Sequence, residues 1–358
     1  MAGSTAAVTR ILEAARRKLL ETGTRNRLIH VNRANLRANS LTIINERSDA
    51  VFDLLRGQGK TMRFKAMGKD RSGEGEGDET QLALPDDTLE PGAARFTDQF
   101  LETPLGPEAL ARRLLRMAGD ARTAEEEQGL NILYLALGFL GWRESAASDV
   151  LREAPLILLP VELVRNPRTA TFELVARDED LTTNLPLQAR LQQDFGLSLP
   201  EIDEAEGWTP AAYFDAVAEV IAAKTGWSID RDGLQLGFFS FAKLLMHRDL
   251  DQSTWADDSL TGNPLLAGLL AEGFAADVPL FGPEDRLDAL LDPADIIQVI
   301  DADASQTKVI EEVRRGASLV VQGPPGTGKS QTITNIIAAA AHDGKSVLFV
   351  AEKMAALS

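Results

Sequence analysis

The sequence predicts a chain in which an α+β body precedes a single unit of the α/β type. Two observations lead to this prediction. Towards the C-terminal end, the apolar runs SLVVQ (residues 318–322) and SVLFVAE (residues 346–352) enclose a glycine-rich loop and a helical segment, which is the order strand, loop, helix, strand. Between residues 93 and 290, helical patterns are interspersed with a strand-like apolar run and an alternating run, which is typical of an α+β domain.

Composition excludes several classes of protein. The chain has 358 residues, 44% of them apolar, which is enough for substantial hydrophobic cores. It has no cysteine, which excludes disulfides and thiolate metal sites, and its histidines, His30, His247 and His342, are isolated in the sequence. The longest apolar stretch, residues 130–142, is shorter than a membrane span. We therefore expect a soluble, cytoplasmic protein that does not associate with a membrane.

Charge is distributed unevenly along the chain. The net charge is −17, yet residues 1–72 hold 15 Lys and Arg against 6 Asp and Glu, which leaves 22 against 48 for the remainder. An acidic body repels nucleic acid, so any such binding must be local and is expected in the basic N-terminal part. Arg25, Asn26 and Arg27 are the candidate phosphate contacts, because the arginine fork suits phosphate oxygens. The alternative is that they form salt bridges or helix caps.

Composition and patterning divide the chain into four segments. Residues 1–69 are expected to be basic and mostly helical, with Ile11, Leu12 and Leu19 at helical spacing. Residues 70–92 include GEGEGDE and are expected to form a flexible linker or loop. Residues 93–290 form the α+β body, and residues 291–358 form the beginning of the C-terminal α/β domain.

The first part of the body alternates between helix and strand signals. Pro107 begins an amphipathic helix, and the apolar run at residues 130–140 is interpreted as a buried helix. Residues 154–164 predict a buried strand that is interrupted at Pro160. After the turn at residues 166–167, an alternating run completes an antiparallel hairpin.

The second part of the body holds one more clear helix and no recognisable catalytic cluster. Thr209 is a good N-cap with Pro210 at the first helical position, and Gly226 is expected to follow the end of that helix. The strongest nuclease candidate is Glu162 on the predicted strand with Glu153 nearby. No lysine accompanies these carboxylates at a spacing that supports the nuclease interpretation.

The loop GPPGTGKS matches the phosphate-binding pattern G-x-x-x-x-G-K-[ST]. Its glycines let backbone N–H groups approach phosphate oxygens, and the helix that begins at Lys329 directs its positive end at the same charge. Lys329 is expected to reach the β- and γ-phosphates of ATP, and Ser330 to ligate Mg²⁺. The alternative is a tight turn without a ligand. The residues expected to hold the nucleotide are Gly323, Pro324, Pro325, Gly326, Thr327, Gly328, Lys329, Ser330 and Gln331.

The C-terminal part resembles the opening of the motor in superfamily 1 DNA and RNA helicases. The resemblance lies in DADASQTKVIEEV (residues 301–313), VVQGPPGTGKSQTITNII (residues 320–337) and VLFVAEKMAAL (residues 347–357). It points to a bacterial group with an uncharacterised N-terminal domain, and it reaches back to TRNRLIHVN (residues 24–32). It implies a RecA-like P-loop NTPase domain that uses ATP and Mg²⁺. It further implies that Gln306 contacts adenine, whereas a polar helix start is the alternative.

The chain departs from that pattern after the loop. The family's acidic pair, which holds Mg²⁺ and orients water, its arginine finger and its second motor domain have no counterpart before Ser358. We therefore expect a truncated helicase or translocase that binds ATP without appreciable hydrolysis, with DNA as a more plausible partner than RNA. The alternatives are a P-loop switch that acts through partner contacts, and a nucleic-acid-binding module whose loop is vestigial.

Overall fold

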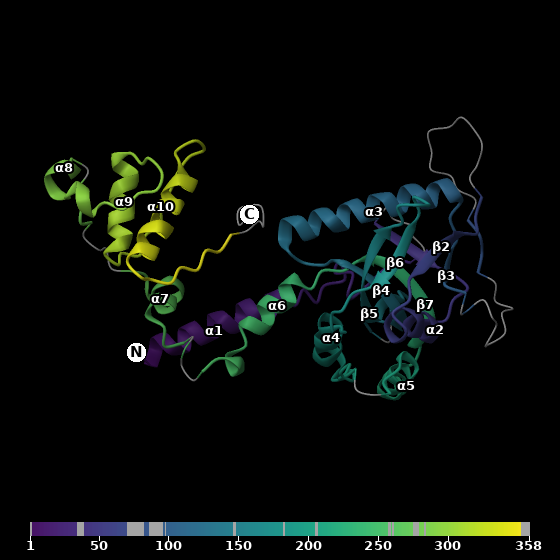
Figure 1. Cartoon of the computed structure of the whole chain (residues 1–358). Coiled ribbons are helices and arrows are strands. Elements are labelled where there is room, and N and C mark those ends of the chain that lie inside the picture. Colours follow the sequence, from purple (N-terminus) through teal and green to yellow (C-terminus); the bar gives the residue numbers. More distant parts are fainter. Residues whose placement is uncertain are drawn as a thin grey trace. The chain divides into compact units, whose positions relative to one another are not determined.

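The computed structural model describes most of the chain in two compact units, residues 1–271 and 272–358, which Figure 1 colours from purple to yellow. The described residues are 2–33, 39–69, 82–85, 96, 98–145, 148–181, 183–204, 207–256, 259, 261–274, 279–282 and 284–351. The predicted linker at residues 70–92 therefore lies outside the described residues, except for residues 82–85.

Unit 1 combines seven strands with helices of very different lengths (Figure 1). The strands are β1 (Ser40–Ile43), β2 (Met62–Ala66), β3 (Phe100–Thr103), β4 (Leu133–Trp142), β5 (Arg152–Arg165), β6 (Phe172–Ala176) and β7 (Ser228–Phe238). The helices are α1 (Ala2–Leu19), α2 (Ser48–Phe52), α3 (Pro107–Gln128), α4 (Leu185–Phe195), α5 (Pro210–Ile221), α6 (Ala242–Asp249) and α7 (Pro264–Ala267).

The seven strands form one sheet in the order β1-β7-β4-β5-β6-β2-β3. All neighbours are antiparallel except β2 and β3, which run parallel. The amide of Ile44, which directly follows β1, donates a 2.9 Å hydrogen bond to the carbonyl of Glu102 in β3. The two ends of the sheet therefore meet, and the sheet is nearly closed.

Strand β4 is the centre of the core and corrects the sequence interpretation. Residues 130–140 were expected to form a helix, but Leu133–Trp142 is a strand that pairs with β5 on one edge and β7 on the other. Every residue of β4 is buried. Its sequence is therefore apolar throughout, and no alternation of polar and apolar residues distinguishes a buried strand from a buried helix. Apolar side chains of α3, α4 and α5 pack in the same core cluster.

Two other expectations for unit 1 need correction. Residues 1–69 are not mostly helical, because they contribute β1 and β2 to the sheet. Strand β5 is not interrupted at Pro160, which stays in register with Tyr134 of β4. Since proline lacks only the donor, its carbonyl can still accept, and it does so from the amide of Arg177 at 2.9 Å.

Several other local signals are confirmed. Pro107 begins α3, and β5 and β6 form the antiparallel hairpin predicted around the turn at residues 166–167. Thr209 caps α5, accepting a 3.2 Å hydrogen bond from the amide of Ala212. The helix ends earlier than expected, at Ile221, because the chain turns through residues 222–226 before β7 begins.

Unit 2 contains α8 (Leu287–Leu290), α9 (Ala304–Arg314) and α10 (Lys329–His342), and α9 packs against α10. The predicted helix after the glycine-rich loop is therefore present. The predicted strands are not: residues 318–322 and 346–351 have no strand assignment, and Val320 and Leu348 are 93% and 88% exposed. A strand requires a neighbour to satisfy its backbone, and the described residues of unit 2 supply none to these two segments.

Candidate functional site

The glycine-rich loop leads directly into α10. Gly326 and Gly328 have φ angles of +87° and +70°, a backbone region that residues with a Cβ rarely adopt. Gly328 is the N-cap of α10, so the N–H groups of Lys329, Ser330 and Gln331 precede the first intrahelical hydrogen bond, from Thr332 to Gly328, and have no acceptor within the helix. This combination of orphan donors and helix dipole favours an anion at the loop.

Glycine is also required at this loop for reasons of space. A Cβ on Gly323 would lie 2.8 Å from Thr327 Oγ1 and 2.9 Å from Lys329 Cγ. A Cβ on Gly328 would overlap the side-chain amides of Gln306 and Gln331. A residue with a Cβ at either position would therefore displace neighbouring side chains, and the absence of a Cβ also lets backbone approach phosphate oxygens closely.

The Lys329 side chain folds back over its own loop. Its ammonium donates to the carbonyl of Gly323 at 2.8 Å and to that of Pro324 at 3.1 Å. Thr327 Oγ1 donates to the same Pro324 carbonyl at 2.8 Å. Lys329 is exposed. Its ammonium can therefore exchange these two carbonyls for an anion without any rearrangement of buried side chains.

Gln306 lies beside the loop because α9 begins there. Its backbone N–H and side-chain carbonyl form a capping box with Asp303, at 2.8 and 3.1 Å. Its side-chain NH₂ donates to the carbonyl of Thr327 at 3.0 Å. The structure therefore brings Gln306 and the loop together, as the sequence interpretation required, and it also gives Gln306 the helix-start role that was the alternative.

Asn335 is a residue of this site that sequence reasoning missed. It is fully buried on α10, and its carbonyl accepts from the amides of Val299 and Ile300 at 2.9 and 3.1 Å. Its NH₂ donates to the carbonyl of Ile300 at 2.9 Å. Asn335 thereby fixes residues 299 and 300, which precede α9, against α10. The sequence did contain a sign of this role, because Asn335 is a polar residue on the apolar face of the segment QTITNII.

The other predicted residues of the loop fit a nucleotide by position. Ser330 is exposed in the first turn of α10 beside the loop, where a hydroxyl can serve as one ligand of Mg²⁺. Pro324, Pro325 and Gln331 are likewise exposed. Among the described residues, no group of three or more His, Asp or Glu side chains could hold a metal ion by itself. The helicase resemblance also implies that residues 351–357 begin a motif that contacts a single strand, with a simple helix start as the alternative, and this segment lies outside the described residues except for Ala351.

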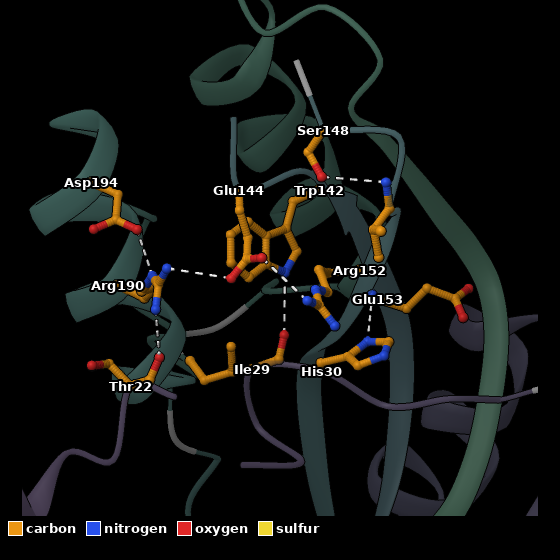
Figure 2. A network of polar contacts seen from close by, with 11 residues as sticks. Thr22, Ile29, His30, Trp142, Glu144, Ser148, Arg152, Glu153, Arg190 and Asp194 are labelled. Atoms are coloured by element: carbon orange, nitrogen blue, oxygen red, sulfur yellow. Dashed lines mark hydrogen bonds and ion pairs between the residues drawn. The ribbon is translucent and has the colours of Figure 1, made fainter. Parts of the chain in front are cut away.

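In unit 1, the segment Thr22–Arg33 is held to the sheet and to α4 by polar contacts (Figure 2). Trp142 Nε1 of β4 donates to the carbonyl of Ile29 at 3.2 Å, and Arg190 of α4 donates to the carbonyl of Thr22 at 3.1 Å. The amide of Glu153 in β5 donates to His30 Nδ1 at 3.2 Å. The segment therefore has a defined conformation although it forms no helix or strand.

The structure gives Arg25, Asn26 and Arg27 three different environments. Asn26 builds the local turn, since its Oδ1 accepts from the amide of Leu28 at 3.0 Å and its Nδ2 donates to the carbonyl of Glu21 at 2.9 Å. The Arg27 guanidinium lies over the Phe239 ring, 5.0 Å from its centroid. Arg25 is exposed. Of the three side chains, Arg25 is therefore the most accessible to a phosphate.

The nuclease candidate is not supported by the geometry. Glu153 and Glu162 are nine positions apart on β5, which corresponds to about 30 Å along a strand and to opposite faces. Glu153 instead forms an ion pair with Arg33 at 2.5 Å. The two carboxylates cannot act on one substrate atom.

Comparisons with known proteins match parts of the chain. Residues 18–191 match a family described as a protein of unknown function (DUF4011). An uncharacterised ATP-dependent helicase of Mycoplasma genitalium is 37% identical over 83 residues, 21% of this chain and 7% of the relative. Its homologue in Mycoplasma pneumoniae is 56% identical over 39 residues, 11% of this chain and 4% of the relative.

The matched segments thus span less than a tenth of either relative. No solved structure matches the chain. Within the described part of the chain, no helix has both the length and the apolar character to cross a bilayer. The chain therefore contains a region of unknown function and is related in part to an ATP-dependent helicase.

Proposed function

We propose that this chain binds ATP at residues 323–330 as part of a superfamily 1 helicase or translocase. The main support is the loop itself, in which Gly326 and Gly328 adopt positive φ angles directly before the orphan amides of α10. Partial similarity to an ATP-dependent helicase adds to this support. DNA is the proposed nucleic-acid partner of the larger machine.

Each site residue has a role in this proposal. The amides at the start of α10 bind phosphate oxygens, and Lys329 leaves the carbonyls of Gly323 and Pro324 for the phosphates. Ser330 holds Mg²⁺, which neutralises charge on the phosphates when it is bound. Gln306 exchanges one of its present hydrogen bonds for the adenine edge. Because the acidic pair and arginine finger of such motors have no counterpart in these 358 residues, the chain binds ATP with negligible turnover.

A second candidate function is a nucleotide-controlled switch that acts on a protein partner. The observation in its favour is the bond from Gln306 to the carbonyl of Thr327, which links the loop to α9. A ligand that shifts Thr327 would also shift the start of α9, and the helix would transmit the change. This function would be favoured if the affinity for a protein partner changed with ATP while the protein neither unwound nucleic acid nor moved along it.

The test is nucleotide affinity, measured with a fluorescent ATP analogue and Mg²⁺. Lys329→Ala should weaken binding about tenfold or more, because it removes a charge-assisted contact to phosphate. The control is Lys345→Ala, which removes a lysine that bonds the carbonyl of Arg314 rather than the loop. Equal affinities of both variants and the parent would overturn the proposal. Hydrolysis stimulated by DNA in these 358 residues would overturn the proposed lack of turnover.

A further inference from the structure

Two neighbouring cavities in unit 1 share Arg25 and Arg27 as a wall. The first has a volume of about 390 Å³. It is lined by Thr24, Arg25, Arg27, His30, Val31, Asn32 and Ser40. Two of these residues are cationic, and none of the described lining residues is a carboxylate. A concave surface of one sign of charge concentrates the field and attracts an anion, even on a protein with net negative charge.

The second cavity is larger and more apolar, with a volume of about 580 Å³. Its described lining consists of Leu19, Leu20, Glu21, Arg25, Asn26, Arg27, Leu28, Gln128, Pro186, Phe238, Phe239, Ser240, Lys243 and Met246. Its one carboxylate, Glu21, is paired with Lys243. Phe238, at the end of β7, is half-buried and belongs to the lining of this cavity.

The local structure explains why Arg25 stands at the junction of the two cavities. The turn at Asn26 is fixed by a 3.0 Å bond from its amide to the carbonyl of Gly23. Arg27, on the other side of the turn, is held against the Phe239 ring. Arg25 is thus presented by a defined backbone with its guanidinium exposed, and its planar fork can contact two oxygens of one phosphate.

His30 adds a second donor to the first cavity. Its Nδ1 accepts from the amide of Glu153, so the neutral ring carries its proton on Nε2. Burial, followed by the nearby charge of Arg152, lowers the pKa of His30. The ring is therefore neutral at physiological pH and offers an Nε2–H donor.

We propose that these two cavities form a binding site for single-stranded nucleic acid. A backbone phosphate occupies the first cavity, on Arg25 and His30, and the adjoining base occupies the second cavity against Phe238. A base can enter a concave site only when it is unpaired and unstacked, which selects a single strand over a duplex. The proposal names the nucleic-acid contact of the helicase-related protein proposed above, and it rests on that function for its biological role.

No aromatic residue is interleaved with these arginines in the sequence, and the fold brings one to them from a distant strand. Phe238 is more than two hundred residues from Arg25 in the sequence, and the order of strands in the sheet brings the end of β7 to this segment. An exposed arginine and a half-buried aromatic residue that line the same cavity fit the combination of phosphate contact and base stacking by which proteins bind single strands.

The test is fluorescence anisotropy of the whole chain with a labelled oligothymidylate of about 20 nucleotides, a length chosen to exceed the footprint of one binding domain. Arg25→Ala should weaken binding about tenfold and reduce the salt dependence by about one phosphate contact. The matched control is Arg168→Ala, which removes the same charge from the exposed β5–β6 turn and should change affinity less than twofold. Equal effects of the two variants would overturn the proposal.

Two further variants separate phosphate from base. His30→Asn keeps an acceptor for the Glu153 amide but removes the Nε2–H donor, and Phe238→Leu keeps an apolar side chain but removes the ring. Each should weaken single-strand binding about three- to tenfold, a typical range for one hydrogen bond or one stacked base. A parent chain that binds the matching duplex as tightly as the single strand would overturn the proposal. So would full competition by inorganic pyrophosphate at equal phosphate concentration, which would indicate an anion site only.

Failure here is distinguishable from failure of the proposed ATP site. All oligonucleotide measurements are made without nucleotide, and Lys329→Ala should leave them unchanged. Conversely, Arg25→Ala should leave the affinity for the ATP analogue unchanged. A loss of oligonucleotide binding in Lys329→Ala would place the strand on the phosphate loop and overturn the assignment to unit 1.

Discussion

The two units bury their apolar residues to different extents. In unit 1, strands β4, β5 and β7 and helices α3 to α5 share one extensive cluster of buried side chains. Among the described residues of unit 2, the buried apolar side chains are Phe281, Ile310 and Ala339. Valines, two leucines and a phenylalanine of residues 318–322 and 346–351 remain exposed there.

This difference indicates how each candidate site is supported. The segment Thr22–Arg33 rests on a nearly closed sheet and is bonded to β4, β5 and α4. The phosphate loop rests on two helices and on a few polar side chains, of which Asn335 and Gln306 are the best placed. We therefore expect core substitutions in unit 1 to act globally, and substitutions near the loop to act locally.

The largest expected effect is that of Gly138→Ala in β4. Gly138 has a φ of +68° at a bulge where the register to β7 shifts, and a Cβ there would overlap the Phe214 ring of α5. Backbone strain and overpacking together should destabilise unit 1 by about 3 kcal/mol or more. The measurement is urea unfolding followed by tryptophan fluorescence, since all four tryptophans lie in unit 1.

Gly119→Ala is the matched control. Gly119 lies inside α3 with nothing within 4 Å of an added Cβ, so alanine should stabilise the protein by about 0.5 to 1 kcal/mol. If Gly138→Ala were as stable as the parent, β4 would not pack against α5 in this way, and the contrast between the units would lose its main support.

Gly138 also illustrates what could be predicted from the sequence and what could not. Caps and turns depend on neighbouring residues, and Pro107, Thr209 and the turn at residues 166–167 were predicted correctly. The apolar run of β4 was not, because its state is decided by β5 and β7, which are distant in sequence. The glycine within that run was a local sign against a helix.

The second-largest effect is expected for Asn184→Ala. Asn184 is buried, and its Nδ2 donates to the carbonyls of Leu28 and Pro155 at 2.7 and 2.8 Å, while its Oδ1 caps α4. Its loss leaves buried carbonyls without this partner and removes a cap, so unit 1 should lose about 3 kcal/mol. Thr209→Ala, which removes only the cap of α5, should cost about 1 kcal/mol. Equal losses in the same unfolding experiment would show that the bridge to Leu28 contributes nothing.

Asn335→Ala should have a smaller and more local effect. Its removal leaves the amides of Val299 and Ile300 and the carbonyl of Ile300 without their side-chain partner, at a cost of about 2 kcal/mol. Hydrogen exchange should accelerate in α9 and α10, while the strands of unit 1 keep their protection. Under the proposed function, ATP affinity should also fall, because the lead-in to Gln306 loses its anchor.

The control for that experiment is Thr334→Ala on the same helix. Thr334 bonds only the carbonyl of Ser330, four residues earlier, so its loss should change stability by less than about 0.5 kcal/mol. Faster exchange in unit 1 as well would indicate that the two units unfold together, which would contradict the contrast drawn above.

For the candidate site, as for the fold, local sequence features could be predicted, whereas features that depend on distant segments could not. The residues of the glycine-rich loop could be named from the sequence because they are contiguous, and their binding of a nucleotide stays a prediction. Asn335 and Phe238 were missed, since their roles depend on the segments that face them in the fold. The sequence interpretation treated Arg25, Asn26 and Arg27 as equivalent. Arg27 differs from Arg25 because it packs on Phe239, which is distant in sequence.

The smallest expected effect is a pH dependence of unit 1 that passes through His30. Its pKa in the folded chain is lowered from the ordinary value of 6.5, mainly by burial and then by Arg152. The unfolded state therefore binds the proton first, so stability is complete above pH 6.5 and declines as the pH falls below it. His247 should contribute with the same sign, since burial and Arg16 lower its pKa.

His30→Asn isolates this contribution, because asparagine can still accept from the Glu153 amide but does not titrate. In urea unfolding at a series of pH values, the variant should lose less stability than the parent between pH 6.5 and 5. The carboxylates with a lowered pKa, such as Glu125, which accepts from Arg177, act in a separate window, because their contribution is lost only as the pH falls below the ordinary pKa of 4.5. Identical slopes in the upper window would mean that His30 is as accessible to protons in the folded chain as in the unfolded one. The defined Nδ1 contact, and with it the Nε2 donor in the cavity, would then be wrong.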